Sequence, residues 1–166
     1  NGHLCAAIAT IADVVPLVGY NRILVSSALQ KIQDCELEGI KKLLTISGLK
    51  DEVLAEDLAF QVIPRINAAQ RMSREGLVWE LLNCENSDRI SEICTELNDL
   101  NNERKKQQKN HFTQVLAGCS EKFKKEGVPE GIVINGSQWH EGLSGLIASN
   151  LVETYHRPVC VILESG

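Results

Sequence analysis

Apolar side chains recur three or four positions apart over much of this chain, which is the period of an amphipathic helix. The segments with this pattern are residues 21–33, 39–47, 52–62 and 66–82. Gly48 follows the second segment as a helix stop, and Pro64 ends the third, because proline has no amide hydrogen and its ring obstructs a helix. The last segment breaks near Ser73 or Gly76, and its Trp79 is assigned to the core.

Residues 4–15 are almost continuously apolar, a run that is too long for one ordinary strand. We predict a helix or a strand that leads into a turn at Asp13, with Pro16 breaking any helix. Asp13 is the one charged residue in this run. A carboxylate at the end of a buried element either caps nearby backbone amides or binds a metal, and the pattern alone leaves both roles open.

A longer helical segment follows Ser87, which we predict to be its N-cap. The apolar stripe of this segment disappears over residues 101–110 and returns at Phe112. A helix that is apolar at both ends and polar all round in its middle is typical of a connection that crosses solvent between two globular bodies. The pattern therefore places a domain boundary on this helix.

The period of the pattern changes after Gly127. Residues 131–135 and 159–163 are short strand-like runs, and residues 143–155 between them carry a helical stripe. This order is a βαβ unit, so the two strands are predicted to be parallel. Ligands bind beyond the carboxyl ends of such strands, which makes the loop around His140 a candidate anion site. His140 suits phosphate contact or proton transfer, or else a plain hydrogen bond to the backbone.

Composition fits a globular α/β protein, since 43% of the 166 residues are hydrophobic and 23% are charged. The chain opens at Asn1 inside an apolar run and stops just after a strand, so we expect a piece of a longer protein. No apolar run reaches the roughly 18 residues that a membrane span needs. The six cysteines are scattered without a Cys-x-x-Cys pair, which predicts buried thiols of a reducing compartment and a cytoplasmic protein.

The net charge of −5 does not by itself favour a nucleic-acid binder. Basic residues are nevertheless bunched in the last part of the chain, at Arg104, Lys105, Lys106, Lys109, Lys122, Lys124 and Lys125. This bunch is either a solvated helix face or a source of local positive potential for a single nucleic-acid strand.

One short segment combines groups that suit an oxyanion, because Pro64 is followed by Arg65, Asn67 and Arg71. Two guanidiniums with an amide between them can hold a phosphate, since each arginine presents paired donors to its oxygens. Ordinary surface ion pairs are the alternative.

The sequence of this segment, Pro-Arg-Ile-Asn-Ala-Ala-Gln-Arg, resembles a signature of the RecJ family. The members of this family are single-strand-specific DNA exonucleases of the DHH phosphoesterase superfamily. Residues 9–22, 97–104 and 136–158 are similar to further blocks of that family, in the same order. The resemblance covers nearly the whole chain. It implies the C-terminal part of a DHH catalytic domain at residues 1–86, a connecting helix at 87–126 and the N-terminal part of a DHH-associated domain at 127–166.

The resemblance also implies a reaction. The family hydrolyses single-stranded DNA from its 5′ end in repair and recombination, with water activated by Mn²⁺ or Mg²⁺. Asp13 matches a metal-binding aspartate of the family, whose other metal ligands lie upstream of the position that corresponds to Asn1. The residues implied to contact the substrate are Arg65, Asn67 and Arg71 in the cleft and His140, Gly142 and Ser149 in the second domain. The implied partners are single-stranded DNA, a single-strand-binding protein and a helicase, and not a membrane.

The chain departs from the family pattern at His3, Ala9, Gln70, Glu141 and Asn150. Asn150 stands where arginine is usual, which weakens the expected phosphate binding, and Gln70 replaces a glycine, which matters only if the backbone needs a positive φ there. Two alternatives follow: another DHH phosphoesterase acting on short oligonucleotides or cyclic dinucleotides, and a catalytically degenerate nucleic-acid-binding scaffold. The lack of a Gly-Gly-His motif argues against the first, and the retention of Asp13 argues against the second.

Overall fold

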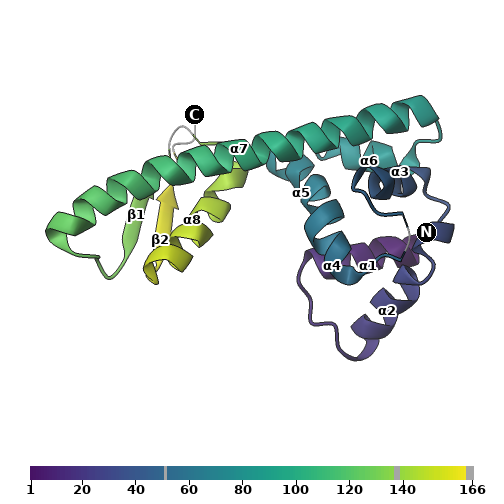
Figure 1. Cartoon of the computed structure of the whole chain (residues 1–166), viewed down its shortest axis with the longest axis horizontal. Helices are drawn as coiled ribbons and strands as arrows, with labels where there is room; N and C mark the ends of the chain where they lie inside the picture. Colours follow the sequence, from purple (N-terminus) through teal and green to yellow (C-terminus); the bar gives the residue numbers. More distant parts are fainter. Residues whose placement is uncertain (51, 137–138, 164–166) are drawn as a thin grey trace. The chain divides into compact units, whose positions relative to one another are not determined.

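The structure, a computed structural model, describes residues 1–50, 52–136 and 139–163 (Figure 1). It is a mostly helical α/β fold with one small parallel sheet. The chain divides into two compact units, residues 1–70 with 74–101 and residues 71–73 with 102–166. No helix within the described residues is long and apolar enough to cross a membrane.

All the regular secondary structure in the described part of the first unit is helical. Its elements are α1 (Gly2–Ala12), α2 (Gly19–Leu29), the short 3-10 helix η1 (Ile32–Asp34), α3 (Glu38–Ile46), α4 (Ala55–Asp57), the π-helical segment η2 (Leu58–Val62), α5 (Ile63–Arg71), α6 (Gly76–Asn83) and the start of α7 (Ser87–Glu126). The first apolar run is therefore a helix, and it buries Leu4, Ala7, Ile8 and Ile11. Their spacing puts these four side chains on one face, and the alanine content of the run favours a helix over a strand.

One apolar core unites these helices. Its most deeply buried large side chains are Ile32, Ile40, Leu43, Leu44, Leu58, Val62, Leu81, Ile93 and Leu97. Helices α3 and α6 approach so closely that a Cβ at Gly39 would overlap the carbonyl oxygen of Leu81. The thiol of Cys94 on α7 donates to the Gly39 carbonyl oxygen, with 3.9 Å between Sγ and O. Glycine at this position is what allows the three helices to meet.

The expectation that Pro64 ends a helix is wrong. The chain is helical without a break through α4, η2 and α5. In η2 the Ile63 amide donates to the carbonyl oxygen of Leu58, five residues back. A widened turn suits proline, which has no amide hydrogen to contribute and whose ring needs room beside the preceding turn. Pro64 therefore sits in the first turn of α5, directly after the widened segment.

Three other local predictions have mixed outcomes. The break after α5 is confirmed, because Ser73 has φ 56° and α6 begins at Gly76. The N-cap of α7 is Asn86 and not Ser87, since the Asn86 Oδ1 accepts the Arg89 amide at 2.9 Å. Trp79 is 73% exposed and so lies outside the core to which the pattern assigned it.

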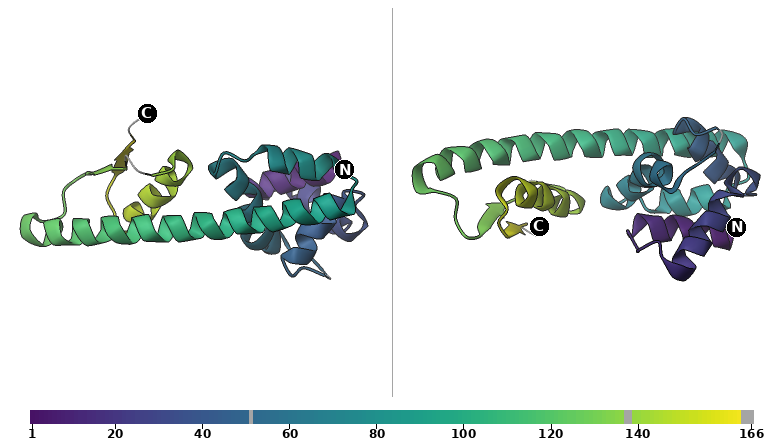
Figure 2. Two further views of the ribbon diagram at one scale, coloured as in Figure 1. Left: turned by 90° about the horizontal axis from the view of Figure 1, so that it is seen from above. Right: turned by 60° about the horizontal axis from the view of Figure 1, so that its bottom comes forward.

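The second unit contains the βαβ motif. Strands β1 (Ile132–Asn135) and β2 (Val159–Ile162) pair in parallel, as predicted, with Ile132 opposite Val159. Helix α8 (Glu141–Tyr155) runs beside β2 (Figure 2). It buries Leu143, Ile147 and Leu151, against which Phe112 and Val115 of α7, Trp139 and Val159 pack. Phe123 of α7 and Tyr155 at the end of α8 pack edge to face beside this core, with 5.1 Å between their ring centroids.

Helix α7 carries an inward-facing row that changes from apolar to polar. Cys94 and Leu97 are fully buried, and Asn101 continues the row at 2% exposure. Arg104, three residues on, is half-buried. The stretch of residues 101–110 is therefore not solvated on all sides, in contrast to the expectation from its composition, because polar groups occupy the row that apolar groups hold earlier in the helix.

Candidate functional site

Asp13 follows α1 at a strained helix end. The Val14 amide donates to the Ile11 carbonyl oxygen and the Val15 amide to that of Thr10, both at 3.1 Å, which is the Schellman pattern. This pattern places Val14 at φ 54°, where glycine is the usual residue. A β-branched side chain in the left-handed region costs about 1–2 kcal/mol. The Val14 side chain is 86% exposed, so burial does not offset this strain.

The Asp13 carboxylate is exposed, and no described residue donates a hydrogen bond to it or forms an ion pair with it. Only its backbone amide is engaged, with the Ala9 carbonyl oxygen at 3.0 Å, so the side chain does not act as a cap. A negative charge at this end of a helix meets the negative end of the helix dipole, which is unfavourable by about 0.3–1 kcal/mol. A bound cation would reverse the sign of that interaction. The local electrostatics therefore favour a cation ligand.

Asp13 alone does not make a metal site. Within residues 1–50, 52–136 and 139–163, no group of three or more His, Cys, Asp or Glu side chains could hold a metal ion. The donor chemistry of Asp13 suits Mg²⁺ or Mn²⁺, which prefer carboxylate oxygens. This chain thus offers one ligand of the expected kind.

Arg65 and Asn67 lie on α5 in the first unit. Arg65 Nη1 donates to the Gln61 carbonyl oxygen, one turn back in the π-helical segment, and its Nε donates to Asn98 Oδ1 at 3.2 Å. These bonds fix the guanidinium against α7 and leave it further N–H donors, since arginine has five. The Asn67 side chain is half-buried and makes no hydrogen bond to a described residue. Both side chains can therefore still donate to an oxyanion.

Arg71 belongs to the second unit, in which it contacts the start of α8. Its Nη1 donates to the Gly142 carbonyl oxygen at 3.1 Å. A Cβ on Gly142 would overlap the backbone carbonyl oxygen of Arg71, so this approach requires glycine. The structure thus brings together two of the residues that the sequence singled out, and it gives Gly142 a packing role beside Arg71.

His140 is the N-cap of α8, where its Nδ1 accepts the Gly142 amide at 3.3 Å. The backbone hydrogen bond considered for this histidine is therefore present at Nδ1, and Nε2 is the ring nitrogen that remains for another partner. Trp139 positions the turn by packing on His111 of α7, with ring centroids 5.6 Å apart. Ser149 follows Gly142 by seven residues on α8, so it lies on the same face about 10 Å further along the axis.

Arg104 is a residue that sequence reasoning did not single out from the basic bunch. Its Nη1 donates to Gln108 Oε1 at 3.1 Å. Burial, and then the positive charge of Arg71, lower the pKa of Arg104 from its ordinary value. The signal that could have separated Arg104 from its neighbours is the helical period, because it follows Leu97 by seven residues and so belongs to the inward row.

The departures from the family pattern are accommodated locally. Gln70 lies within α5 and is not among the residues with positive φ, so its backbone does not require glycine. Glu141 occupies the first turn of α8, where the helix dipole favours a carboxylate. The His3 Nε2 pairs with the Ser27 hydroxyl at 2.8 Å. Asn150 is half-buried on α8 and supplies no cation there.

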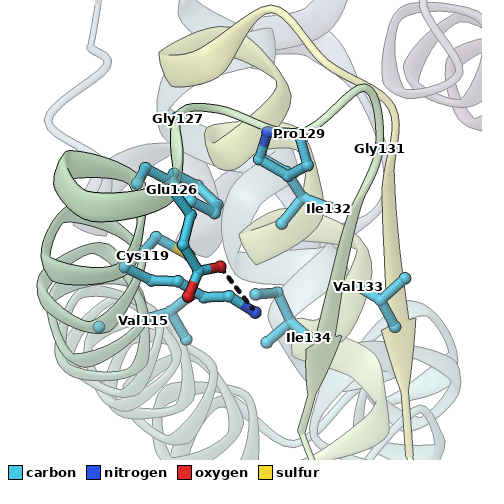
Figure 3. A pocket seen from close by; sticks show the side chains of 12 residues that line it. Val115, Cys119, Glu126, Gly127, Pro129, Gly131, Ile132, Val133 and Ile134 are labelled. Atoms are coloured by element: carbon cyan, nitrogen blue, oxygen red, sulfur yellow. Dashed lines mark ion pairs between the residues drawn. The ribbon is translucent and has the colours of Figure 1, made fainter.

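A groove of about 560 Å³ in the second unit lies between α7 and β1 (Figure 3). Its wall is largely apolar and includes Val115, Cys119, Ile132 and Ile134, with an ion pair of Lys122 and Glu126 at 4.0 Å. Its lining includes none of the candidate site residues Asp13, Arg65, Asn67, Arg71, His140, Gly142 and Ser149. It is therefore separate from the candidate site.

Similar proteins share one name. The single-stranded-DNA-specific exonuclease RecJ of Salmonella typhimurium is 37% identical to this chain over 164 residues, which cover 96% of the chain and 28% of that protein. The RecJ of Escherichia coli is 34% identical over 163 residues, with the same two shares. No protein-family model matches the chain.

Solved structures agree with the sequence comparison. The crystal structure of RecJ in complex with Mg²⁺ from Thermus thermophilus has a TM-score of 0.84 at 30% identity, covering 97% of this chain and 25% of that one. The structure of the same protein with Mn²⁺ also scores 0.84, at 31% identity. In sequence and in fold, this chain is RecJ-like. The resemblance inferred from the motifs is thereby confirmed, and the chain spans about a quarter of the length of these relatives.

Proposed function

We propose that the protein containing this chain is a metal-dependent exonuclease specific for single-stranded DNA, degrading it from the 5′ end in DNA repair and recombination. The observation that carries the proposal is the match in sequence and fold, over nearly the whole chain, to RecJ proteins named for that exonuclease activity. In this proposal its partners are single-stranded DNA, a single-strand-binding protein and a helicase.

The proposal assigns a part of the enzyme to each region of the chain. Residues 1–86 are the C-terminal part of the DHH catalytic domain, residues 87–126 are the connecting helix, and residues 127–166 are the N-terminal part of the DHH-associated domain. The continuous helix α7 and the parallel βαβ unit after it are consistent with this division.

Asp13 is the catalytic residue of this chain in the proposal, as one carboxylate ligand of Mn²⁺ or Mg²⁺. Its exposure and its position at the negative end of the α1 dipole support that role. When bound, such ions lower the pKa of a water and stabilise the departing oxygen of a phosphodiester. Asp13 contributes a fixed oxygen donor, because the hydrogen-bonded turn after α1 holds its backbone in place.

The remaining candidate residues bind the DNA strand in this proposal. The residues that donate to its phosphates are Arg65, Asn67, Arg71, His140 through Nε2, and Ser149, whose hydroxyl would turn to the phosphate from the Gly145 carbonyl oxygen to which it donates at 3.0 Å. Charge-assisted bonds from arginine are the strongest of these contacts. Gly142 acts by holding Arg71, because its missing side chain is what admits the Arg71 backbone.

The test of the proposal is the variant Asp13→Asn, made in the full-length protein and compared with Asp99→Asn. Asp99 is an exposed aspartate on α7 for which no ion pair or hydrogen bond within the described residues is recorded. Asp13→Asn should abolish metal-dependent release of nucleotides and weaken Mn²⁺ binding measured by calorimetry. It should also unfold at a slightly higher urea concentration, because it removes the unfavourable helix-end charge. Full activity in Asp13→Asn would show that Asp13 is not a metal ligand.

A second experiment separates the enzyme from a degenerate scaffold. The coding sequence upstream of Asn1 should encode further aspartate and histidine ligands, including an Asp-His-His triplet. If those positions carry other residues, the fold assignment stands but the catalytic proposal fails.

A further inference from the structure

We propose that one exposed face of α7, formed by Lys105, Lys106 and Lys109 and here called the lysine face, binds the phosphate backbone of single-stranded DNA. The inference deepens the proposed function and rests on it for the identity of the strand. It adds a contact surface outside the residues that the motifs single out, and it can be tested by binding without a metal ion.

The three lysines share one side of the helix. All of them are exposed, whereas Leu97 and Asn101 of the inward row are buried. The helical period places the lysines within an arc of about 100° around the axis. Asn102 and Thr113, which are also exposed, fall on the same arc. Over residues 102–113 the lysine face is therefore continuous and polar.

The charges of the lysine face are not compensated by carboxylates of this chain. Residues 104–120 contain four Lys and Arg and no Asp or Glu, although the whole chain has 22 acidic residues against 17 basic ones. The nearest carboxylate in the sequence is that of Glu103, which accepts from Gln107 Nε2 at 2.8 Å. Within the described residues, no carboxylate forms an ion pair with a lysine of this face.

The spacing of the three lysines is not that of a surface built only for helix stability. Elsewhere on α7, Arg89 pairs with Glu92 at 3.1 Å, three residues on. Lys122 pairs with Glu126 at 4.0 Å, four residues on. On the lysine face the same two spacings join like charges, which destabilises a helix. A bound polyanion removes that repulsion, so a ligand accounts for the arrangement and helix stability does not.

The helix dipole does not account for these lysines either. Helix α7 has 40 residues, Ser87–Glu126, and the lysine face lies in its middle. The attraction of a cation to the negative end of a helix is confined to the last turn. It therefore favours Lys124 and Lys125, which are in that turn, and leaves residues 105–109 unaffected.

The chemistry of the lysine face fits a nucleic-acid backbone better than a protein partner. No large apolar side chain of α7 is exposed. Protein interfaces depend on buried aromatic or aliphatic anchors, whereas phosphates are held by lysine, asparagine and threonine side chains of the kind present here. A strand with a phosphate at every nucleotide matches a row of cations on an otherwise acidic chain. Without an aromatic platform for the bases, this contact should not depend on base identity.

The lysine face lies near the candidate site along the axis of α7. His111, two residues after Lys109, packs on Trp139, with ring centroids 5.6 Å apart. Trp139 directly precedes His140, to which the proposed function assigns a phosphate contact. Two residues correspond to about 3 Å along the helix axis. A strand held at His140 therefore reaches the lysines by continuing around the helix.

The experiment measures the affinity of the full-length protein for oligothymidine, labelled with fluorescein at its 3′ end, by fluorescence anisotropy without divalent metal. The test variant is Lys105→Gln/Lys109→Gln. The matched control is Lys31→Gln/Lys50→Gln, which removes the same charge from two exposed lysines that have no ion pair with a described residue.

The expected loss depends on salt. The test variant should make the slope of log K against log salt shallower by about 1.4, the value for two lost phosphate contacts on a single strand. Over one decade of salt concentration this slope corresponds to a change in affinity of about 25-fold. Oligoadenine should show the same loss as oligothymidine, and the control variant should change either affinity by less than about twofold.

Three results would overturn the proposal. Equal losses in the test and control variants would reduce the effect to net charge. Unchanged affinity for oligothymidine, with weaker binding of poly-glutamate, would identify an acidic polypeptide as the partner. A thermal midpoint of the test variant well below that of the wild type would make the lysines structural. The expected midpoint is equal or slightly higher, because glutamine has the helix propensity of lysine and removes the repulsion.

This inference and the proposed function can fail separately. Weaker DNA binding in the test variant of a protein that does not cleave DNA with metal would overturn the exonuclease proposal alone. Metal-dependent cleavage of a long strand with the same KM in the wild type and the test variant would overturn this inference alone.

Discussion

The contact between Gly142 and Arg71 leads to a quantitative prediction for Gly142→Ala. A Cβ at this position would lie 2.8 Å from both the carbonyl carbon and the Cα of Arg71, and closer still to the carbonyl oxygen. All three atoms are backbone, so no side-chain rotation can relieve the overlap, and the end of α5 must move away. Overpacking of this kind costs about 1–3 kcal/mol.

Two further terms change the size of this effect. Movement of Arg71 also breaks its bond to the Gly142 carbonyl oxygen, a charged hydrogen bond of about 1.5–3 kcal/mol. Alanine regains at most about 1 kcal/mol of helix propensity. Gly142→Ala should therefore lower the free energy of unfolding of the second unit by about 1.5–5 kcal/mol.

Gly145→Ala is the matched control, because a Cβ at Gly145 on the same helix would meet no atom within 4 Å. It should stabilise α8 by about 0.5–1 kcal/mol. The assay is urea unfolding followed by Trp139 fluorescence in a Trp79→Phe background, which leaves Trp139 as the single tryptophan. If Gly142→Ala and Gly145→Ala were equally stable, the close approach of the Arg71 backbone to Gly142 would be refuted. The fixed position of Arg71 would be refuted with it.

The other two predictions concern the first unit. Val14→Gly should raise the free energy of unfolding by about 1 kcal/mol, because the strain of valine in the left-handed region exceeds the extra chain entropy of glycine. The control is Val18→Gly, where the backbone has an ordinary φ of −122°. This variant should lower the free energy of unfolding in the same urea titration. Hydrogen bonds from Arg89 lower the pKa of Glu80. The ionised Glu80 therefore stabilises the folded state at pH values above the ordinary glutamate pKa. This stabilisation is lost as the pH falls through the lowered pKa of the folded state. Glu80→Gln should therefore flatten the acid side of the stability–pH curve, and an unchanged curve would show that the Arg89 contact is without effect.

The helical period was sufficient to predict most of the described elements. It identified α2, α3, α5 and α6 of the first unit, the break at Ser73 and the parallel βαβ unit, because each of these follows from which face of an element is buried, but it left α1 open between a helix and a strand. It failed at Pro64, where the penalty for proline is avoided by a π-helical turn that no local sequence rule signals. It also failed at Trp79, because hydrophobic character does not determine whether an individual side chain finds a place in the core.

The candidate site was less accessible to sequence reasoning than the fold. The motifs named Asp13, Arg71 and Gly142, but only the structure shows that the Arg71 backbone rests on Gly142 and that the Asp13 carboxylate caps nothing. Contacts between residues 71 positions apart depend on tertiary packing, which the pattern of one chain does not encode. Arg104 was missed because it lies in a run of basic residues, where composition conceals its inward position.

The residues named by motif coincide with places where local rules are broken. Asp13 puts a carboxylate at the disfavoured end of a helix, next to a valine in a conformation suited to glycine. Arg104 is a half-buried arginine, and burial, followed by the charge of Arg71, lowers its pKa. A sequence optimised for stability alone would contain neither arrangement, and the one at Asp13 becomes favourable when a cation is present. In the proposed function Asp13 would take a cation and Arg71 an oxyanion, which are the two kinds of ion that a metal-dependent phosphodiesterase binds.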